Sequence, residues 1–236
     1  MLIVTGLGRC GTSLMIDFIG RVGVEIARDH MSFDKNKRAG LEFAPAYSIN
    51  RDLFTDFISY GKKIDVDKVI DTPYFGKISY RDRILKIGED PPVDAIKDPR
   101  FMWHPDIIET WYKVRGKDIK VLILHREFEE VILSRLKAGW KDGDPKRRKN
   151  INELKIDFAE FMTRILKLGI AYSILYYPNF LKEYDSVYKA LSHLDINFDK
   201  EEGKSIWSDL VNMDFVSSPE DLGRYRNGME RSIKTN

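Results

Sequence analysis

The start of the chain passes from an apolar run into a glycine-rich segment and then into a helical pattern. Residues 2–5 (Leu-Ile-Val-Thr) are largely apolar and end at Gly6, which favours a buried strand. Apolar residues recur at helical spacing over residues 13–21. The glycines between the two patterns allow backbone N–H groups to converge on an anion at the positive end of the helix dipole. We therefore expect a strand, an anion-binding loop and a helix in succession.

Apolar runs and helical patterns continue to alternate along the chain. The clearest strand is residues 119–124, and the amphipathic pattern of residues 127–139 predicts a helix directly after it. We expect further short strands at residues 22–24, 93–96 and 180–184, and helices at residues 46–60, 67–88 with an interruption near Pro73, 105–114, 151–177 and 186–194. Continuous apolar strands separated by helices indicate a parallel sheet covered on both faces. The predicted fold class is α/β, a three-layer sandwich with a central parallel sheet.

Composition excludes several classes of protein. The 236 residues are 43% hydrophobic and 32% charged, which is typical of one globular domain; we expect a core over residues 1–200 and a C-terminal arm or tail over about residues 201–236. The formal charge of +2 favours neither nucleic acid nor an acidic membrane as a partner. The single cysteine excludes a disulfide framework and a cysteine-rich zinc site. With no apolar stretch of about 18 residues and no signal peptide, a cytoplasmic protein is expected.

Two general interpretations of the glycine-rich segment follow from its spacing. Residues 6–11 fit G-x-G-x-x-G, the dinucleotide-binding fingerprint, and Glu25 lies near the position that would bind the ribose. The same spacing fits a kinase-type Walker A loop, but Thr12 stands where that loop has its phosphate-binding lysine. The strongest strand ends in His125-Arg126 rather than in an aspartate that would bind magnesium. The nucleotide-kinase interpretation therefore lacks its lysine and an obvious metal ligand.

A third interpretation places the cation inside the turn. Arg9, followed by Gly11-Thr12-Ser13-Leu14, resembles the 5′-phosphosulfate-binding loop of PAPS-dependent sulfotransferases, whose pattern is roughly (K/R)-x-G-T-(S/T)-L. The resemblance implies a P-loop-like sulfotransferase fold and the cofactor PAPS, 3′-phosphoadenosine-5′-phosphosulfate. Arg9 would contact the bridging oxygen or the leaving 5′-phosphate, and a thiol reagent at Cys10 would block binding. The implied cofactor-binding residues of the loop are Gly8, Arg9, Cys10, Gly11, Thr12 and Ser13.

Two later segments agree with this interpretation. Arg126 ends the strongest strand and Ser134 follows eight residues later, which resembles the pair that binds the 3′-phosphate in the family. A guanidinium supplies a planar charged fork, and the hydroxyl supplies a second donor. Lys97-Asp98-Pro99-Arg100 resembles the Lys-Asp-Pro-Arg motif of many bacterial sulfotransferases. Lys97 and Arg100 would direct positive charge towards the sulfonate, and Asp98 would orient one of them.

A general base is useful because an acceptor hydroxyl must lose its proton. The segment Gly40-Leu41-Glu42-Phe43 resembles the Gly-Tyr-Phe-Glu segment of the family, which makes Glu42 the first candidate. Many cytosolic sulfotransferases have a histidine base two residues after the motif lysine, and Pro99 takes that position here. The alternative bases are His30 and Asp98, and the candidates for contact with the acceptor are Asp98, Arg100 and His30.

The resemblance covers residues 2–199 and implies an enzyme. The expected reaction is in-line, metal-independent transfer of a sulfuryl group from PAPS to a hydroxyl or amine of a small-molecule or glycan acceptor. Its expected catalytic residues are Arg9, Glu42 and Lys97. By analogy with phosphoryl transfer, cations and backbone donors would supply most of the catalysis. The alternatives are a nucleotide kinase and a non-catalytic nucleotide-binding protein that keeps the loop.

Overall fold

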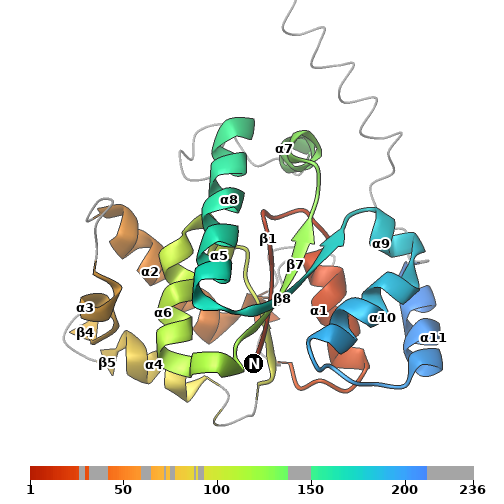
Figure 1. The fold of residues 1–236 in the computed structure, drawn as a ribbon, viewed down its shortest axis with the longest axis horizontal. Coiled ribbons are helices and arrows are strands. Elements are labelled where there is room, and N and C mark those ends of the chain that lie inside the picture. Colours follow the sequence, from red (N-terminus) through yellow and green to blue (C-terminus); the bar gives the residue numbers. More distant parts are fainter. Residues whose placement is uncertain are drawn as a thin grey trace, which may run out of the picture.

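The computed structural model describes residues 1–26, 30–31, 42–59, 65–71, 73–74, 78–87, 89, 93–137 and 150–211. Its centre is a four-stranded parallel sheet in the order β6-β1-β7-β8, made of β1 (Leu2–Gly6), β6 (Ala95–Lys97), β7 (Lys120–His125) and β8 (Ala171–Tyr176). Figure 1 labels β1, β7 and β8. Every residue of β1 is buried, and so are the four central residues of β7. Burial on both faces of the sheet accounts for the unbroken apolar runs that predicted these two strands.

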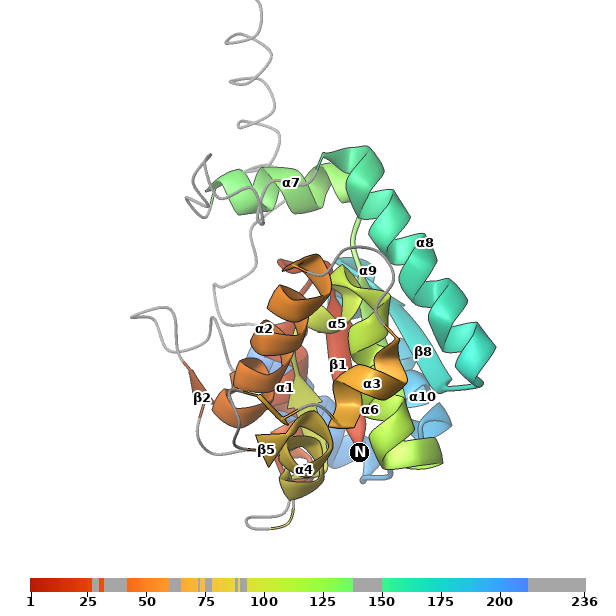
Figure 2. The ribbon, with the colours of Figure 1, turned by 90° about the vertical axis from the view of Figure 1, so that its left-hand side faces the viewer.

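Helices lie on both sides of the sheet, which confirms the predicted α/β fold (Figures 1 and 2). One side carries α1 (Thr12–Arg21), α10 (Tyr184–His193) and α11 (Lys200–Val211). The other side carries α5 (Arg100–Trp103), α6 (Pro105–Arg115) and α8 (Ile151–Leu168), with α2 (Ala44–Ser59) packed against α5 and α6. α7 (Phe128–Lys137) lies beyond the carboxyl end of β7. The smaller elements are α3 (Val66–Asp71), α4 (Tyr80–Lys86), α9 (Asn179–Lys182), the 3₁₀ helix η1 (Gly116–Asp118), and the antiparallel pairs β2 (His30–Met31) with β3 (Glu42–Phe43) and β4 (Pro73–Tyr74) with β5 (Ile78–Ser79).

The helix predicted over residues 151–177 is wrong in its last part. α8 begins with a capping box between Asn150 and Glu153 but ends at Leu168, after which Gly169 adopts a left-handed φ of 64°. Residues 171–176 then form β8, which pairs in parallel with β7. Nearly every residue from 170 to 177 is apolar, so this segment also satisfies helical spacing and periodicity did not reveal the break.

Two short predicted strands are also wrong. Residues 22–24 lie in and after a turn in which Gly23 has a φ of 94°, a conformation that a strand does not contain. Residues 180–184 include most of α9 and the first residue of α10. Phe180, Leu181 and Tyr184 are buried, which is helical rather than alternating spacing. The helical region predicted near Pro73 is interrupted as expected, and β4 and β5 separate α3 from α4 there.

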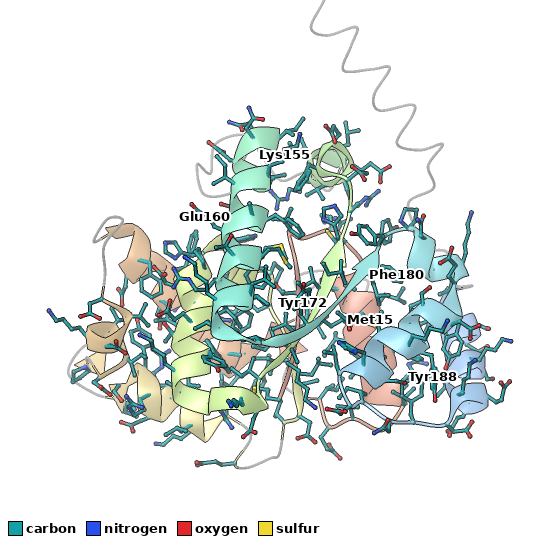
Figure 3. All side chains as sticks on the ribbon, in the orientation of Figure 1. Met15, Lys155, Glu160, Tyr172, Phe180 and Tyr188 are labelled. Carbon is teal, nitrogen blue, oxygen red and sulfur yellow. The ribbon has the colours of Figure 1, made fainter. Side chains whose placement is uncertain are left out.

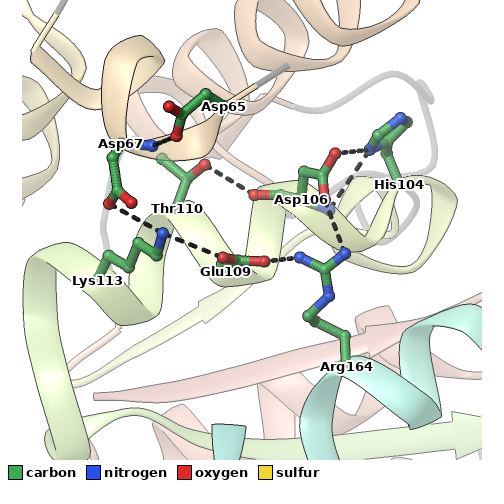
Figure 4. A network of polar contacts seen from close by, with 8 residues as sticks. All are labelled: Asp65, Asp67, His104, Asp106, Glu109, Thr110, Lys113 and Arg164. Carbon is green, nitrogen blue, oxygen red and sulfur yellow. Dashed lines mark hydrogen bonds and ion pairs between the residues drawn. The ribbon is translucent and has the colours of Figure 1, made fainter. Parts of the chain in front are cut away.

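A chain of ion pairs ties α6 to α3 and α8 (Figure 4). Lys113 of α6 pairs with Asp67 of α3 at 2.8 Å and with Glu109, one turn earlier, at 3.2 Å. Arg164 of α8 pairs with Glu109 and, at 3.0 Å, with Asp106. Partly exposed pairs contribute about 0–1 kcal/mol each, so this network positions the helices more than it stabilises the fold.

Residues 200–211, which we expected near the start of a C-terminal arm, form α11 and pack against α1. The ring of Trp207 lies 5.1 Å from that of Phe18 in an edge-on arrangement, and 6.0 Å from that of Phe180 in α9. Figure 3 shows Phe180 and Met15 of α1 on this same side of the sheet. The remainder of the expected arm, residues 212–236, lies outside the described residues. In the described part of the chain, no helix combines the length and apolarity needed to span a membrane.

Candidate active site

The order of the strands places a topological switch point between β1 and β7. From β1 the chain passes first to β6 on one side and later to β7 on the other. Open α/β sheets bind their ligands at the carboxyl ends of the strands beside such a point. The loop of residues 7–11 leaves β1 there, and Arg126 follows β7 at the same edge of the sheet. The fold therefore brings the glycine-rich loop and a predicted phosphate-binding arginine to the place where a ligand is expected.

The loop has a backbone that glycine adopts most easily. Gly8 and Gly11 have φ angles of 86° and 82°, and Arg9 has a φ of 62°. A non-glycine residue in this left-handed region is strained by about 1–2 kcal/mol, and such strain is concentrated at functional sites. At Gly11 a Cβ atom would also lie 3.0 Å from Phe180 and 3.2 Å from Tyr177. Both its backbone angle and the lack of space require glycine at this position.

Backbone N–H groups gather at this loop and have no acceptor among the residues that the structure describes. Gly11 is the N-cap of α1, which has no side-chain cap and no acidic residue in its first turn. Within the described residues, the N–H groups from Gly8 to Leu14 donate no hydrogen bond, and that of Met15 is the first to do so, to the carbonyl of Gly11 at 3.0 Å. Unpaired N–H groups at the positive end of a helix dipole attract anions. The residues present therefore fit a phosphate or sulfate group.

Three of the predicted cofactor-binding residues meet beside the loop. Nε of Arg9 donates to Oγ of Ser134 at 3.3 Å, and Nη1 of Arg126 donates to the carbonyl of Arg9 at 3.0 Å. Arg126 and Ser134 are each 3% exposed. The Arg126 guanidinium also pairs with Glu130 at 3.0 Å and lies 4.5 Å from the centre of the Tyr177 ring. Arg126 and Ser134, the pair that the resemblance suggested for a phosphate, thus both lie at the glycine-rich loop.

Lys97 reaches the start of α1 from β6, the strand on the other side of β1 from β7. It ends β6, and its Nζ donates to Oγ of Ser13 at 3.2 Å. Lys97 is 4% exposed, and Thr12 beside Ser13 is also buried. A charge with little solvent around it is weakly screened, so it acts strongly on nearby groups. The structure therefore gathers predicted residues from β6, from the segment after β1 and from the segment after β7.

Asp98 is the centre of a buried polar network. Its Oδ2 accepts from Nδ2 of Asn50 at 3.1 Å, and its Oδ1 accepts from the backbone N–H and from Nη1 of Arg100, both at 2.9 Å. Nε1 of Trp111 donates to Oδ1 of Asn50 at 2.8 Å, and the Arg100 guanidinium lies 3.9 Å from the centre of the Tyr47 ring. Asp98 has no exposed surface and both of its oxygens are engaged. This environment favours the predicted orienting role of Asp98 over that of a general base.

The first candidate base belongs to an antiparallel pair beside the sheet. Glu42 lies in β3 and His30 lies in β2, where His30 pairs with Phe43. β3 contacts β6, whose last residue is Lys97. The side chains of Glu42 and His30 lie outside the described part of the chain, so their catalytic roles stay predictions.

Cys10 is turned into the protein. It has no exposed surface, its thiol donates to the carbonyl of Gly8 at 3.2 Å, and burial raises its pKa to about 12. The thiolate is the reactive form of a cysteine, so the protonated and buried Cys10 should react slowly. This burial argues against direct blocking of the site by a thiol reagent.

Sequence reasoning missed two neighbours of the loop. Arg135, 6% exposed, follows Ser134 in α7, and its Nη2 donates to the carbonyl of Leu7. Tyr177 packs against both Gly11 and Arg126. The available signal for Arg135 was its place beside Ser134 on a helix that starts at the predicted phosphate site. Tyr177 was not assigned to the site, because the helix predicted over its segment concealed the end of β8.

Glu25 does not lie where a ribose-binding carboxylate belongs. Its carbonyl accepts hydrogen bonds from the N–H groups of Asp94 at 2.8 Å and Ala95 at 3.2 Å, at the amino end of β6. The glycine-rich loop lies at the carboxyl end of β1, and dinucleotide-binding folds place both features at that edge. The position of Glu25 therefore argues against the dinucleotide-binding interpretation.

Comparison with known proteins gives a fold but no family. No protein-family model matches the chain, and no curated protein matches it in sequence. Among solved structures it resembles the sulfotransferase STF9 from Mycobacterium avium, with a TM-score of 0.50 and 13% sequence identity over 98% of this chain and 76% of that one. At this level of identity the likeness concerns the fold alone. The helix-rich α/β arrangement with its parallel sheet is consistent with the sulfotransferase fold, as the sequence predicted.

Proposed function

We propose that this protein is a sulfotransferase that moves a sulfuryl group from PAPS to a hydroxyl or amine of an acceptor. The observation that carries the proposal is the meeting of Arg9, Arg126 and Ser134 at an anion-binding loop. The 3′-phosphate distinguishes PAPS from ATP, and a buried arginine beside a hydroxyl suits a phosphate group. The likeness of the fold to that of a sulfotransferase supports the same assignment.

The loop and α1 are assigned to the 5′-phosphate side of the cofactor. N–H groups from Gly8 to Leu14 and the hydroxyls of Thr12 and Ser13 bind the phosphate, and Arg9 neutralises negative charge on the leaving oxygen. Bound PAPS supplies an activated sulfuryl group that carries a single negative charge. Lys97, held at Ser13, places a second cation beside this group. Cations and backbone donors are thus available for the charge stabilisation that the transfer needs.

Arg126 and Ser134 are assigned to the 3′-phosphate. Nη1 and Nε of Arg126 already have partners, Arg9 and Glu130, and Nη2 makes no hydrogen bond to any described residue. Nη2 of Arg126 and the hydroxyl of Ser134 therefore provide the donors for the 3′-phosphate. The contact between Arg9 and Ser134 links the two phosphate subsites directly.

Glu42 is assigned as the general base that takes the proton of the acceptor hydroxyl. As the bond from this oxygen to sulfur forms, the bond from sulfur to the 5′-phosphate oxygen breaks, and the proton passes to the Glu42 carboxylate. Glu42→Gln should lower kcat by about a hundredfold, within the range for loss of a general base, and leave affinity for the product unchanged. Steady-state kinetics and isothermal titration measure the two quantities. Turnover near the wild-type rate would remove Glu42 as the base.

The proposal is tested by product binding followed by transfer. At about a hundred times its dissociation constant, 3′-phosphoadenosine-5′-phosphate (PAP) should stabilise the protein by about 2.7 kcal/mol and raise Tm by about 5–10 °C. AMP at the same concentration should raise Tm less because it lacks the 3′-phosphate. Sulfur-labelled PAPS incubated with a panel of alcohols, phenols, amines and glycans should then pass its label to an acceptor. The absence of any shift with PAP would contradict the proposal.

The same experiment separates the two alternatives. A non-catalytic nucleotide-binding protein would bind PAP and transfer label to no acceptor. A nucleotide kinase would bind magnesium–ATP, and this binding would survive Arg126→Ala because the phosphate loop would carry it.

A further inference from the structure

Three successive carbonyl groups of the loop each accept a hydrogen bond from a side chain. The pairs, with the carbonyl first, are Leu7 with Nη2 of Arg135, Gly8 with the thiol of Cys10 at 3.2 Å, and Arg9 with Nη1 of Arg126 at 3.0 Å. All three donor side chains are buried: Arg135 is 6% exposed, Arg126 3% and Cys10 0%. Arg135, Cys10 and Arg126 are called the carbonyl clamp below.

The carbonyl clamp decides where the N–H groups of the loop point. In a trans peptide unit, the carbonyl of one residue and the N–H of the next point in opposite directions. Because the carbonyls of residues 7, 8 and 9 face buried donors, the N–H groups of Gly8, Arg9 and Cys10 face away from those donors. These N–H groups belong to the set that has no acceptor in the described part of the chain. The clamp therefore directs them towards the anion site.

The carbonyl clamp also accounts for the strained residue of the loop. Arg9 has a φ of 62°, which a non-glycine residue keeps only where the surrounding structure holds it. Arg126 binds its carbonyl, and Ser134 accepts from its side chain, so Arg9 is held at both ends. Two of the three clamp donors are guanidinium groups, whose hydrogen bonds are stronger than those of neutral donors. The protein itself thus supplies the interactions that shape the loop.

We propose that Arg135 is a positioning residue of the phosphate site, which acts by holding the loop and touches no cofactor atom. A preorganised loop loses less conformational freedom on binding, so Arg135 raises affinity without a contact of its own. The effect on cofactor affinity rests on the proposed function, whereas the effect on the loop does not. Loss of Arg135 should therefore weaken binding of PAP and also expose Cys10, the one cysteine of the chain.

The test follows the reaction of Cys10 with iodoacetamide in the folded full-length protein, because this reaction reports opening of the loop and needs no nucleotide. Arg135→Met removes the donor to Leu7 and keeps a long side chain, and it should raise the labelling rate by about tenfold or more. Arg135→Lys keeps a charged donor and should restore part of the protection. Arg164→Met is the matched control: it removes an arginine that pairs with Asp106 and Glu109 between α6 and α8, and should leave labelling at the wild-type rate.

Affinity for PAP, measured by isothermal titration, completes the test. Arg135→Met should weaken it by about tenfold, and Arg164→Met should not change it. Faster labelling of Arg135→Met, in a protein whose wild type does not bind PAP, would support the clamp and contradict the proposed function. If Cys10 is labelled in Arg135→Met no faster than in the wild type or in Arg164→Met, the clamp is overturned, whatever the result for PAP.

Cys10 supplies a second test if Arg135→Met does not fold. Cys10→Ser keeps a donor for the carbonyl of Gly8, whereas Cys10→Ala removes it. Hydrogen exchange of the first hydrogen-bonded amides of α1, from Met15 onward, reports opening of the loop that ends at Gly11. Followed by mass spectrometry, it should stay near the wild-type rate in Cys10→Ser. In Cys10→Ala it should be about tenfold faster. Equal exchange in the two variants would overturn the role of the thiol in the clamp.

Discussion

Replacement of Lys97 by methionine should lower kcat for sulfuryl transfer by about a thousandfold, at the upper end of the range for loss of one preorganised donor. The reason is the setting of this lysine: it is 4% exposed and its Nζ lies 3.2 Å from Oγ of Ser13, so its charge acts with little screening where the sulfuryl group is expected. Methionine keeps much of the length and loses the charge. Steady-state rates at saturating PAPS measure the effect, and isothermal titration with PAP should show affinity within about threefold of the wild type, because PAP lacks the sulfuryl group.

Lys120→Met is the matched control for this variant. Lys120 begins β7, at the opposite edge of the sheet from the loop, and makes an ion pair with Asp195 at 2.7 Å. Its loss should leave kcat unchanged. If Lys97→Met weakens PAP binding as much as it lowers the rate, Lys97 binds the phosphates and does not assist the transfer.

Arg126→Ala should weaken binding of PAP by several hundredfold and binding of adenosine-5′-phosphosulfate by about tenfold or less. Charge-assisted hydrogen bonds contribute about 1.5–3 kcal/mol each, and the second ligand has no 3′-phosphate with which to make them. Both ligands should lose some affinity because Arg126 also donates a hydrogen bond to the carbonyl of Arg9 and so holds the loop. The difference between the two losses of affinity gives the contribution of the contact between Arg126 and the 3′-phosphate. Competitive titration of both ligands against the same variant measures this difference.

Ser134→Ala should give the same discrimination at smaller size, about tenfold for PAP and little for adenosine-5′-phosphosulfate, since one neutral hydroxyl is lost. The control is Arg21→Ala, which removes an exposed arginine paired with Asp17 on the far turns of α1. Equal losses for the two ligands in Arg126→Ala would show that Arg126 acts through the loop alone and would remove it from the 3′-phosphate subsite.

The parts of the fold that could be predicted from the sequence are those whose pattern is local. β1 and β7 are the two central strands of the sheet and are apolar over most of their length. The glycines after β1 form a turn with positive φ angles, which few other residues adopt. β8 was missed because its strand character depends on pairing with β7, whereas its composition also suits a helix. Gly169 could be seen in the sequence, but a single glycine inside an apolar pattern does not show whether a helix is kinked there or ends there.

The candidate site divides in the same way. Arg9, Arg126 and Ser134 were predicted from the resemblance of their motifs to those of sulfotransferases, and the structure places the three together. Arg135 was missed because its partner is a backbone carbonyl 128 positions away, a contact that no spacing rule encodes. The network of Asp98 with Asn50 was likewise hidden, since Asn50 comes from α2, which only the packing of the helices brings to β6.

Residues that contact one another at the candidate site are far apart in the sequence, and this separation determines at which stage of folding the site forms. Arg9 and Ser134 touch across 125 positions, and β7 must already lie beside β1 before Arg126 can reach the carbonyl of Arg9. Contacts of this separation form late, because the chain must close a large loop before it gains them. Under the proposed function, nucleotide recognition is thus a property of the finished chain topology, and the first strand and helix made alone would carry the glycine motif without this function.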